Sequence, residues 1–155
     1  MTAPHFALGH VVLNVASLER SIPFYRDALG MREVARGASE QHGPGAGMVF
    51  FSFGTSHHDI ALREVPAATP AGREGVGLFH IAVRIGNSLA ELRAYQARLA
   101  RLGVRILRAR DHRVSQSIYF EDPDNLLVEA YVDADPEIWR ADPGAVATGC
   151  PLKLD

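Results

Sequence analysis

The sequence contains two copies of one pattern, and this duplication restricts the fold more than any other feature. An alternating apolar run begins at His10, and a second begins at His80, 70 residues later. In both runs aliphatic residues occupy every second position, as expected for a β-strand with one buried face. We therefore expect the chain to fold as two similar halves.

A helix is predicted after each of these strands. The first follows Ser17 and the second follows Ser88. Serine is a favoured N-cap because its hydroxyl accepts a free backbone N–H. Glu91 follows Ser88 at the spacing of a capping box. Gly30 and Gly103 stand where glycine C-caps are expected to end the two helices.

Three short strand-like runs follow each helix, so each half has the predicted order β-α-β-β-β. They cover residues 31–36, 47–53 and 58–65 in the first half and residues 104–108, 114–120 and 126–132 in the second. The predicted fold class is α+β, in which two βαβββ modules related by pseudo-twofold symmetry form an open barrel. The centre of such a barrel is a natural cavity for a ligand.

We expect one domain over residues 1–155. Module 1 covers about residues 6–65, a Gly/Pro-rich linker covers about 66–77, and module 2 covers about 78–133. A tail over about 134–155 is expected to lie on the surface, anchored by Trp139. The single cysteine, Cys150, excludes an intrachain disulfide and Cys-rich metal modules, and we assign it no role.

The charge balance excludes several classes of partner. Sixteen Lys+Arg stand against 18 Asp+Glu, so the chain lacks the basic field on which non-specific nucleic-acid binding depends. No apolar run approaches the roughly 18 residues of a membrane span. The N-terminus shows no secretory signal pattern. We therefore expect a cytoplasmic protein without nucleic-acid or membrane partners.

Three side chains are candidate metal ligands. Strand alternation places His10 and His80 at equivalent positions on the faces away from the helices, and Glu129 on the corresponding face of the last strand. A buried mid-strand carboxylate requires compensation, which two imidazoles and a divalent ion would supply. Two histidines and one carboxylate suit non-haem Fe(II). Each residue alone also fits a structural role, as a surface or core histidine or an edge-strand glutamate.

These residues resemble the vicinal oxygen chelate superfamily, which includes glyoxalase I, bleomycin- and fosfomycin-resistance proteins and extradiol dioxygenases. The resemblance covers about residues 6–133 and implies that His10, His80 and Glu129 hold the metal in the central cavity. Four-ligand members such as glyoxalase I carry a further ligand on the last strand of the first module. Ala61 stands there and cannot ligate, which favours three protein ligands.

Two further runs resemble the type I extradiol, or catechol-2,3-dioxygenase-like, members. His57-His58-Asp59-Ile60-Ala61 is similar to their His-Asp-x-Ala strand, and the segment 111–123 is similar to their His…Tyr-Phe-x-Asp-Pro signature. The resemblance implies catalytic roles for His58, His112 and Tyr119.

Each of these three residues also has a purely structural explanation, as a polar strand start, a loop histidine and a barrel-filling tyrosine. Arg113 and Asn125 depart from the family, because glycine is usual at both positions. In the implied mechanism, His112 or Tyr119 donates a hydrogen bond to the diol, and His58 stabilises reduced oxygen and passes a proton. The inward side chains of Val12 and Phe51 are expected to hold the ring.

The predicted function is an Fe(II)-dependent extradiol dioxygenase that cleaves a catecholic ring with O2 in aromatic hydrocarbon catabolism. Mn(II) or another divalent ion is the alternative cofactor, and a homodimer or higher homo-oligomer is expected. A glyoxalase-like or fosfomycin-resistance-like lyase or transferase is a second hypothesis, and its metal preference and indifference to oxygen would distinguish it. A metal-free, bleomycin-resistance-like binding protein is a third.

Overall fold

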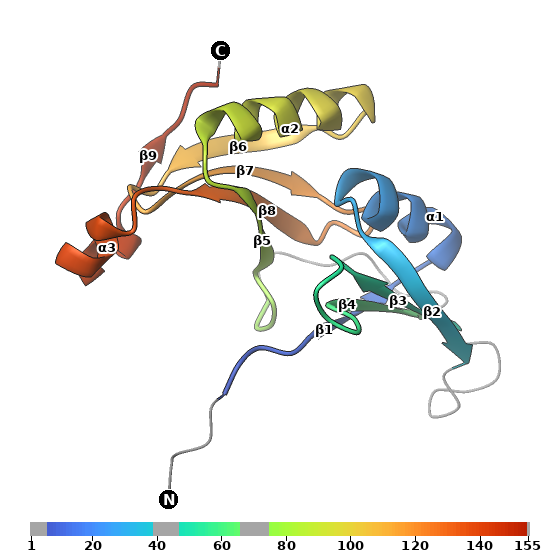
Figure 1. Ribbon diagram of the computed structural model, residues 1–155. Coiled ribbons are helices and arrows are strands. Elements are labelled where there is room, and N and C mark those ends of the chain that lie inside the picture. The colour runs from blue at the N-terminus through green and yellow to red at the C-terminus, as the bar shows by residue number, and fades with distance from the viewer. Residues whose placement is uncertain (1–5, 39–46, 66–74, 155) are drawn as a thin grey trace, which may run out of the picture. The chain divides into compact units, whose positions relative to one another are not determined.

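The structure is a computed structural model, and it describes residues 6–38, 47–65 and 75–154 (Figure 1). Contacts divide the chain into two compact units, Met1–Thr69 and Pro70–Asp155, and we describe each by itself. Most of the predicted linker, residues 66–74, lies outside the described residues. None of the described helices is both long and apolar enough to cross a membrane.

The first unit is a four-stranded sheet with one helical segment. Its elements are β1 (Val11–Val15), α1 (Leu18–Pro23), the π-helical turn η1 (Phe24–Ala28), β2 (Arg32–Ala38), β3 (Gly47–Ser52) and β4 (Ile60–Glu64). The strand order is β1-β4-β3-β2. The pair β1–β4 is parallel, and the pairs β4–β3 and β3–β2 are antiparallel.

The second unit repeats this arrangement and adds one strand. Its elements are β5 (His80–Gly86), α2 (Leu89–Arg101), β6 (Ile106–Asp111), β7 (Ser115–Glu121), β8 (Leu127–Asp133), α3 (Glu137–Ala141), the 3₁₀ helix η3 (Pro143–Ala147) and β9 (Cys150–Pro151). The strand order is β5-β8-β7-β6-β9, with β5–β8 parallel. Both sheets are open, and each unit has the order βαβββ. The α+β fold of two such modules is therefore confirmed, and their arrangement around a shared cavity stays a prediction.

The repeat extends to irregularities that the sequence does not reveal. The register of β2 against β3 shifts between Glu33 and Ala35, and that of β6 against β7 shifts between Ile106 and Arg108. A β-bulge of this kind inserts one unpaired residue into a strand. Both modules therefore carry a bulge at the same place in their outer strands.

The helix–sheet packing repeats as well. The Tyr25 ring lies 6.1 Å from the Phe51 ring, and the Tyr95 ring lies 6.2 Å from the Phe120 ring. In each pair a tyrosine of the helical segment contacts a phenylalanine of the third strand of its module. Pro23 lies inside the helical turn, and the chain widens into η1 directly after it. Proline lacks an N–H donor and crowds the preceding turn, which accounts for the change of helix type.

Each helix begins and ends at the predicted residues. The Ser17 hydroxyl accepts the N–H of Arg20 at 3.4 Å, and the Ser88 hydroxyl accepts the N–H of Glu91 at 3.3 Å. Gly30 and Gly103 follow with φ of 69° and 71°, the left-handed conformation that glycine adopts without strain. The predicted caps are therefore confirmed.

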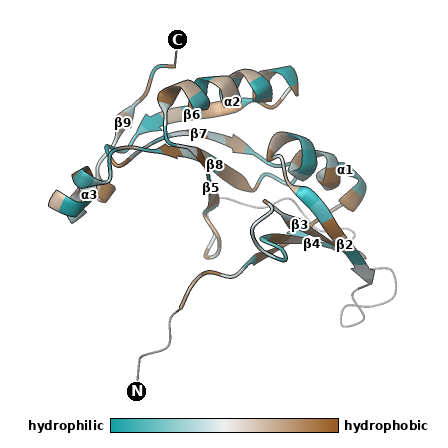
Figure 2. Cartoon of the chain, in the orientation of Figure 1, coloured by the Kyte–Doolittle hydropathy of each residue, from teal (hydrophilic) through white to brown (hydrophobic). Residues whose placement is uncertain are grey.

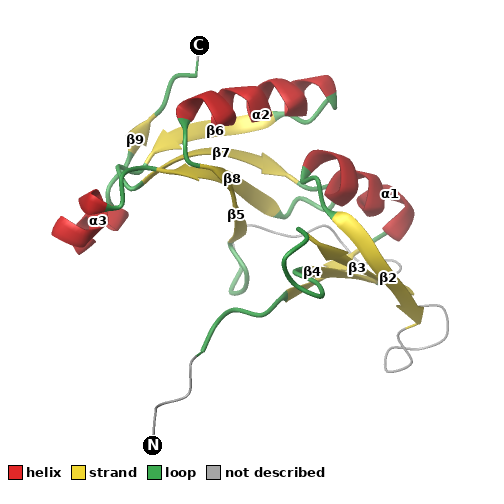
Figure 3. Ribbon diagram, in the orientation of Figure 1, coloured by secondary structure: helices red, strands yellow, loops and turns green. Residues whose placement is uncertain are grey.

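Each sheet buries the face that carries its helix. Figure 3 shows α1 and α2 in red, each lying along strands of its own sheet, and Figure 2 shows hydrophobic residues in brown along β7 and β8. The buried apolar side chains on the helix-covered faces include Leu13, Val15, Val49, Phe51, Leu62, Ile81, Ile118, Phe120, Val128 and Ala130. Phe51 is fully buried against Tyr25 on this side, so the prediction that it faces a ligand cavity is wrong. Phe50, which pairs with Ala61, lies on the other face.

The tail is more structured than predicted. Trp139 is 50% exposed and does not anchor it, whereas Ala145 in η3 is fully buried. Cys150 and Pro151 pair with Asp111 and Arg110, so β9 extends the sheet beyond β6 (Figure 1). This segment therefore covers the end of β6, where backbone groups would otherwise be unpaired at the edge of the sheet.

The cap of α2 gives a test of the local structure. Replacement of Ser88 by alanine removes the side chain that accepts the Glu91 N–H and that donates to the Glu91 carboxylate at 2.7 Å. We expect Ser88→Ala to lower the free energy of unfolding by about 1 kcal/mol, measured by urea denaturation. Ser56→Ala, an exposed serine outside the helices, is the matched control. Equal stability of the two variants would contradict the capping role.

Candidate functional site

One face of the second unit's sheet carries polar side chains, and its opposite face lies under α2. In register across the sheet, Ala82 of β5 pairs with Glu129 of β8, Glu129 pairs with Tyr119 of β7, and Tyr119 pairs with Arg108 of β6. Directly paired residues share a face, and His80 lies two residues before Ala82 on the same side. Strand pairing thus brings residues from four strands to one surface.

Glu129 and His80, two of the three predicted metal ligands, are in direct contact. Glu129 is only 8% exposed. Its Oε1 accepts a hydrogen bond from the Ser117 hydroxyl at 2.5 Å, and its Oε2 lies 3.0 Å from His80 Nε2. The carboxylate therefore has one donor held by the neighbouring strand and faces an imidazole nitrogen with its second oxygen.

The chemistry of this pair fits a divalent ion. Two adjacent ligands at right angles, each about 2.1 Å from an ion, are themselves about 3 Å apart, which is close to the observed Nε2–Oε2 separation. His80 Nδ1 is buried and has no hydrogen-bond partner in the described structure. Among residues 6–38, 47–65 and 75–154, no group of three or more His, Cys, Asp or Glu side chains is gathered at one ion position. The three-ligand set with His10 therefore stays a prediction.

His112 and Tyr119, both predicted as catalytic, form a hydrogen-bonded pair. His112 Nε2 lies 2.9 Å from the Tyr119 hydroxyl, and His112 Nδ1 lies 3.3 Å from the Thr148 carbonyl oxygen. A carbonyl oxygen only accepts, so Nδ1 donates to it, and in the tautomer with its proton on Nδ1 the Nε2 atom accepts from Tyr119. Burial, reinforced by the neighbouring Glu129 carboxylate, raises the pKa of Tyr119 to about 12. Its hydroxyl therefore remains a donor across the neutral pH range.

The two departures from the family pattern have a common conformational explanation. Arg113 and Asn125 have φ of 65° and 66°, the left-handed region that favours glycine. The Asp111 carboxylate accepts the N–H of Arg113 at 2.7 Å, and the Asp122 carboxylate accepts the N–H of Leu126 at 2.8 Å. These bonds hold the two turns, and the first of them directs His112 toward Tyr119.

The other predicted residues lie in the first unit. The ring of His58 lies 4.3 Å from that of His10, 4.5 Å from that of His57 and 5.3 Å from that of Phe50. Desolvation and the neighbouring rings of His10 and His57 lower the pKa of His58, against a smaller opposing effect of Asp59. The structure thus brings His10 and His58 together in the first unit. In the second unit it brings together four predicted residues, namely His80, Glu129, His112 and Tyr119. A common site for the two groups stays a prediction.

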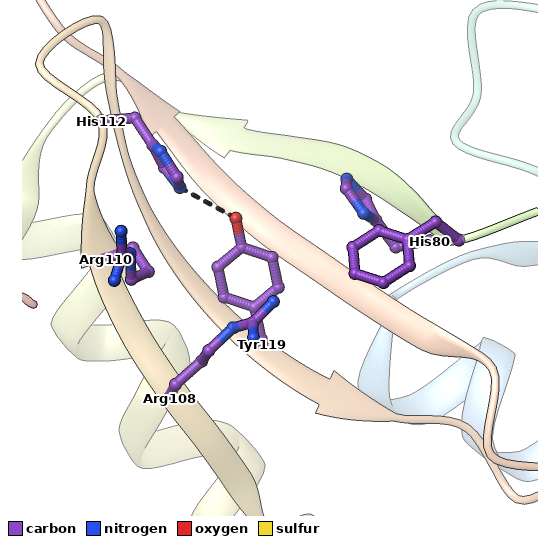
Figure 4. A pocket seen from close by; sticks show the side chains of 6 residues that line it. His80, Arg108, Arg110, His112 and Tyr119 are labelled. Atoms are coloured by element: carbon purple, nitrogen blue, oxygen red, sulfur yellow. Dashed lines mark hydrogen bonds between the residues drawn. The ribbon is translucent and has the colours of Figure 1, made fainter. Parts of the chain in front are cut away.

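A pocket of about 410 Å³ opens on the polar face of the second unit (Figure 4). It is lined by Phe79, His80, Arg108, Arg110, His112 and Tyr119. The guanidinium carbon of Arg108 lies 4.5 Å from the centre of the Tyr119 ring. A pocket of this volume, with aromatic walls and a few convergent polar groups, is typical of a small-molecule site.

Sequence reasoning missed three polar residues of this face, namely Ser117, Arg108 and Arg110. Ser117 lies two residues before Tyr119, and strand alternation alone would have placed both on one face. The arginines were missed because the strand was predicted over 104–108, whereas β6 extends from Ile106 to Asp111 and contains a bulge. A bulge reverses the facing of the residues beyond it and leaves no clear mark in the sequence.

Comparison with known proteins places this geometry in a family. Residues 7–130 match the family model of the Glyoxalase/Bleomycin resistance protein/Dioxygenase superfamily. The chain is 29% identical over 136 residues to catechol-2,3-dioxygenase of Bacillus subtilis, covering 87% of this chain and 44% of that protein. It is 30% identical over 134 residues to biphenyl-2,3-diol 1,2-dioxygenase 2 of Rhodococcus globerulus, covering 86% and 65%. The chain thus spans less than two thirds of the length of these two relatives.

Fosfomycin-resistance proteins are similar to a comparable degree. Metallothiol transferase FosB of Lysinibacillus sphaericus is 31% identical over 120 residues, covering 76% of each chain. The structure of FosX from Listeria monocytogenes, complexed with Mn(II) and a dihydroxypropylphosphonic acid, matches with a TM-score of 0.66 and 27% identity over 88% of this chain and 98% of that one.

A glyoxalase/bleomycin resistance protein/dioxygenase domain from Frankia has the same fold, with a TM-score of 0.70 and 23% identity over 84% of this chain and 99% of that one. The family model alone covers most of the chain, and the duplicated βαβββ topology agrees with it. The chain belongs to the Glyoxalase/Bleomycin resistance protein/Dioxygenase superfamily.

Proposed function

We propose that this protein is a metal-dependent extradiol dioxygenase that cleaves a catecholic ring with O2. The observation that carries the proposal is the pairing, on one sheet face, of His80–Glu129 with the hydrogen-bonded His112–Tyr119. The first pair suits a divalent ion, and the second suits proton transfer beside it. The names of the dioxygenase relatives support the same reaction class.

His80 and Glu129, with His10 of the first unit, would hold the ion. Fe(II) is the proposed metal because two histidines and one carboxylate leave coordination positions open for both reactants. When bound, Fe(II) would supply acidification of the diol and activation of O2. Ser117 orients the Glu129 carboxylate by donating to its Oε1.

Tyr119 and His112 form a relay for the diol proton. The diol hydroxyl donates to the Tyr119 oxygen, whose own proton lies toward His112 Nε2. As the diol proton moves to Tyr119, the Tyr119 proton moves to Nε2, and His112 becomes an imidazolium. The Thr148 carbonyl keeps Nδ1 protonated throughout, so Nε2 remains the accepting atom.

The remaining predicted residues complete the proposal. The aromatic surfaces of Phe79 and Tyr119 in the pocket would hold the ring of the substrate. His58, which contacts His10, is proposed to stabilise the reduced oxygen and to pass a proton to it. Both atoms of O2 enter the product, and the carbon–carbon bond beside the diol breaks. A homo-oligomeric state and a cytoplasmic location stay predictions.

Ring cleavage is tested by loading the protein with Fe(II) under anaerobic conditions and adding air-saturated catechols. We expect stoichiometric O2 uptake and a yellow muconic semialdehyde product. Absence of both across a broad catechol panel would reject the proposal.

The relay predicts a selective effect at Tyr119. Tyr119→Phe removes the hydroxyl that links the diol to His112, and we expect kcat to fall about 100-fold. Tyr95→Phe is the matched control, because Tyr95 packs against Phe120 on the helix-covered face. An unchanged kcat in Tyr119→Phe would remove Tyr119 from the mechanism.

The ligand assignment predicts a loss of metal binding. We expect Glu129→Gln and His80→Ala to lower Fe(II) affinity at least 100-fold, because each removes a proposed ligand. Iron per chain after desalting is the measurement, and Glu137→Gln on the exposed surface of α3 is the control. A variant at either position that retains one iron per chain would refute its assignment as a ligand.

Fosfomycin modification is the second candidate, favoured by the similarity to FosB and FosX and by the two arginines in the pocket. The test is consumption of fosfomycin by the Mn(II)-loaded protein, with and without an added thiol. Consumption at a rate independent of O2, with no catechol cleavage, would establish this function in place of ring cleavage.

A further inference from the structure

Two arginine side chains, Arg108 and Arg110, line the pocket, and the fold does not require a positive charge at either position. Beyond the bulge in β6, Arg108 pairs with Tyr119 and Arg110 pairs with Ser117. Both arginines therefore share the face of Tyr119, separated by about 7 Å along the strand. The equivalent positions after the bulge of β2 are Ala35, which pairs with Phe50, and Gly37. One copy of the module folds with small side chains at these positions, so the arginines of the other copy need an explanation beyond the fold.

Neither guanidinium is neutralised by a carboxylate within the described structure. Other arginines of the second unit form ion pairs, as Arg84 does with Asp133 at 3.0 Å and Arg113 with Asp142 at 3.4 Å. Arg108 instead lies over the Tyr119 ring, and Arg110 donates to the Gly149 carbonyl oxygen at 3.2 Å. Glu129, which pairs with Tyr119 on this face, is engaged by Ser117 and His80.

We propose that Arg108 and Arg110 form a subsite that holds a carboxylate substituent of an aromatic diol substrate. Guanidinium groups bind carboxylates through paired N–H donors, and each carries five such donors. The subsite rests on the proposed function, because it assumes that the diol end of the substrate lies at His80 and Glu129.

The positions of the two ends suit one substituted ring. The Tyr119 ring lies 6.1 Å from the His80 ring and 4.5 Å from the Arg108 guanidinium carbon. Figure 4 shows His80 on one side of Tyr119, Arg110 on the other side, and the Arg108 guanidinium against the Tyr119 ring. A catechol whose diol lies at His80 would therefore direct its far substituent toward the arginines. A neutral substrate would leave both cations without a counter-ion in the pocket.

The experiment compares acids with their own esters. Binding of 3,4-dihydroxybenzoate, 2,3-dihydroxybenzoate and 3,4-dihydroxyphenylacetate, and of their methyl esters, is measured by calorimetry with and without Fe(II). We expect at least one acid to bind tenfold or more tightly than its ester. Arg108→Gln and Arg110→Gln should each weaken that acid about 10- to 100-fold and leave its ester unchanged.

Two further variants separate charge from folding. Arg93→Gln, on the exposed surface of α2, is the matched control and should bind acid and ester as the wild type does. Arg108→Lys retains the charge without the planar donor pair, and it should bind the acid more weakly than the wild type but more tightly than Arg108→Gln.

Each outcome bears on one proposal. Equal affinity for acid and ester in all three pairs, an equal loss for both on substitution, or no binding of any acid would overturn the subsite. Arginine-dependent binding of an acid without cleavage of any diol would support the subsite and reject the dioxygenase. Arginine-dependent binding of methylphosphonate but of no carboxylate would overturn the carboxylate assignment and favour a phosphonate substrate.

Discussion

The site depends on a carboxylate that is buried inside a β-sheet. Glu129 occupies the middle of β8 with strands on both sides, where an unpaired charge would be strongly destabilising. The two neighbouring strands provide its polar contacts. Ser117 of β7 donates a hydrogen bond to Oε1, and Nε2 of His80 on β5 lies 3.0 Å from Oε2. These three residues come from adjacent strands. The register of the sheet therefore determines which polar groups lie next to the Glu129 carboxylate.

The helix-covered face maintains that register. Side chains on the two faces of a strand alternate, so a shift of one residue would exchange Glu129 for Val128 or Ala130, both fully buried under α2. Tyr95 of α2 contacts Phe120 of β7, the residue directly after Tyr119, so this packing contact fixes the position of β7 next to the site. The apolar packing on one face therefore determines which polar groups meet on the other.

Much of the fold and part of the site could be predicted from the sequence. The repeated His-aliphatic runs and the Ser and Gly caps mark the modules, because strand alternation and helix capping are local. His80, Glu129, His112 and Tyr119 follow from the same alternation and from family resemblance. The bulge before Arg108, the burial of Phe51 and the pairing of β9 with β6 could not be predicted, because each depends on contacts between distant parts of the chain.

The two copies differ in chemical character along one face, whereas the other face is apolar in both. On the helix-covered face, Phe51 and Phe120 occupy equivalent positions and contact a tyrosine in the same way. On the opposite face, Glu129, Tyr119 and Ser117 of the second module stand where Ala61, Phe50 and Met48 stand in the first. Packing against a helix tolerates few changes, since a core is filled to high density. A face outside that core has no such restriction, and there the second copy carries an acid, a phenol and two arginines. The two copies share only a histidine at the start of this face, His10 in the first and His80 in the second.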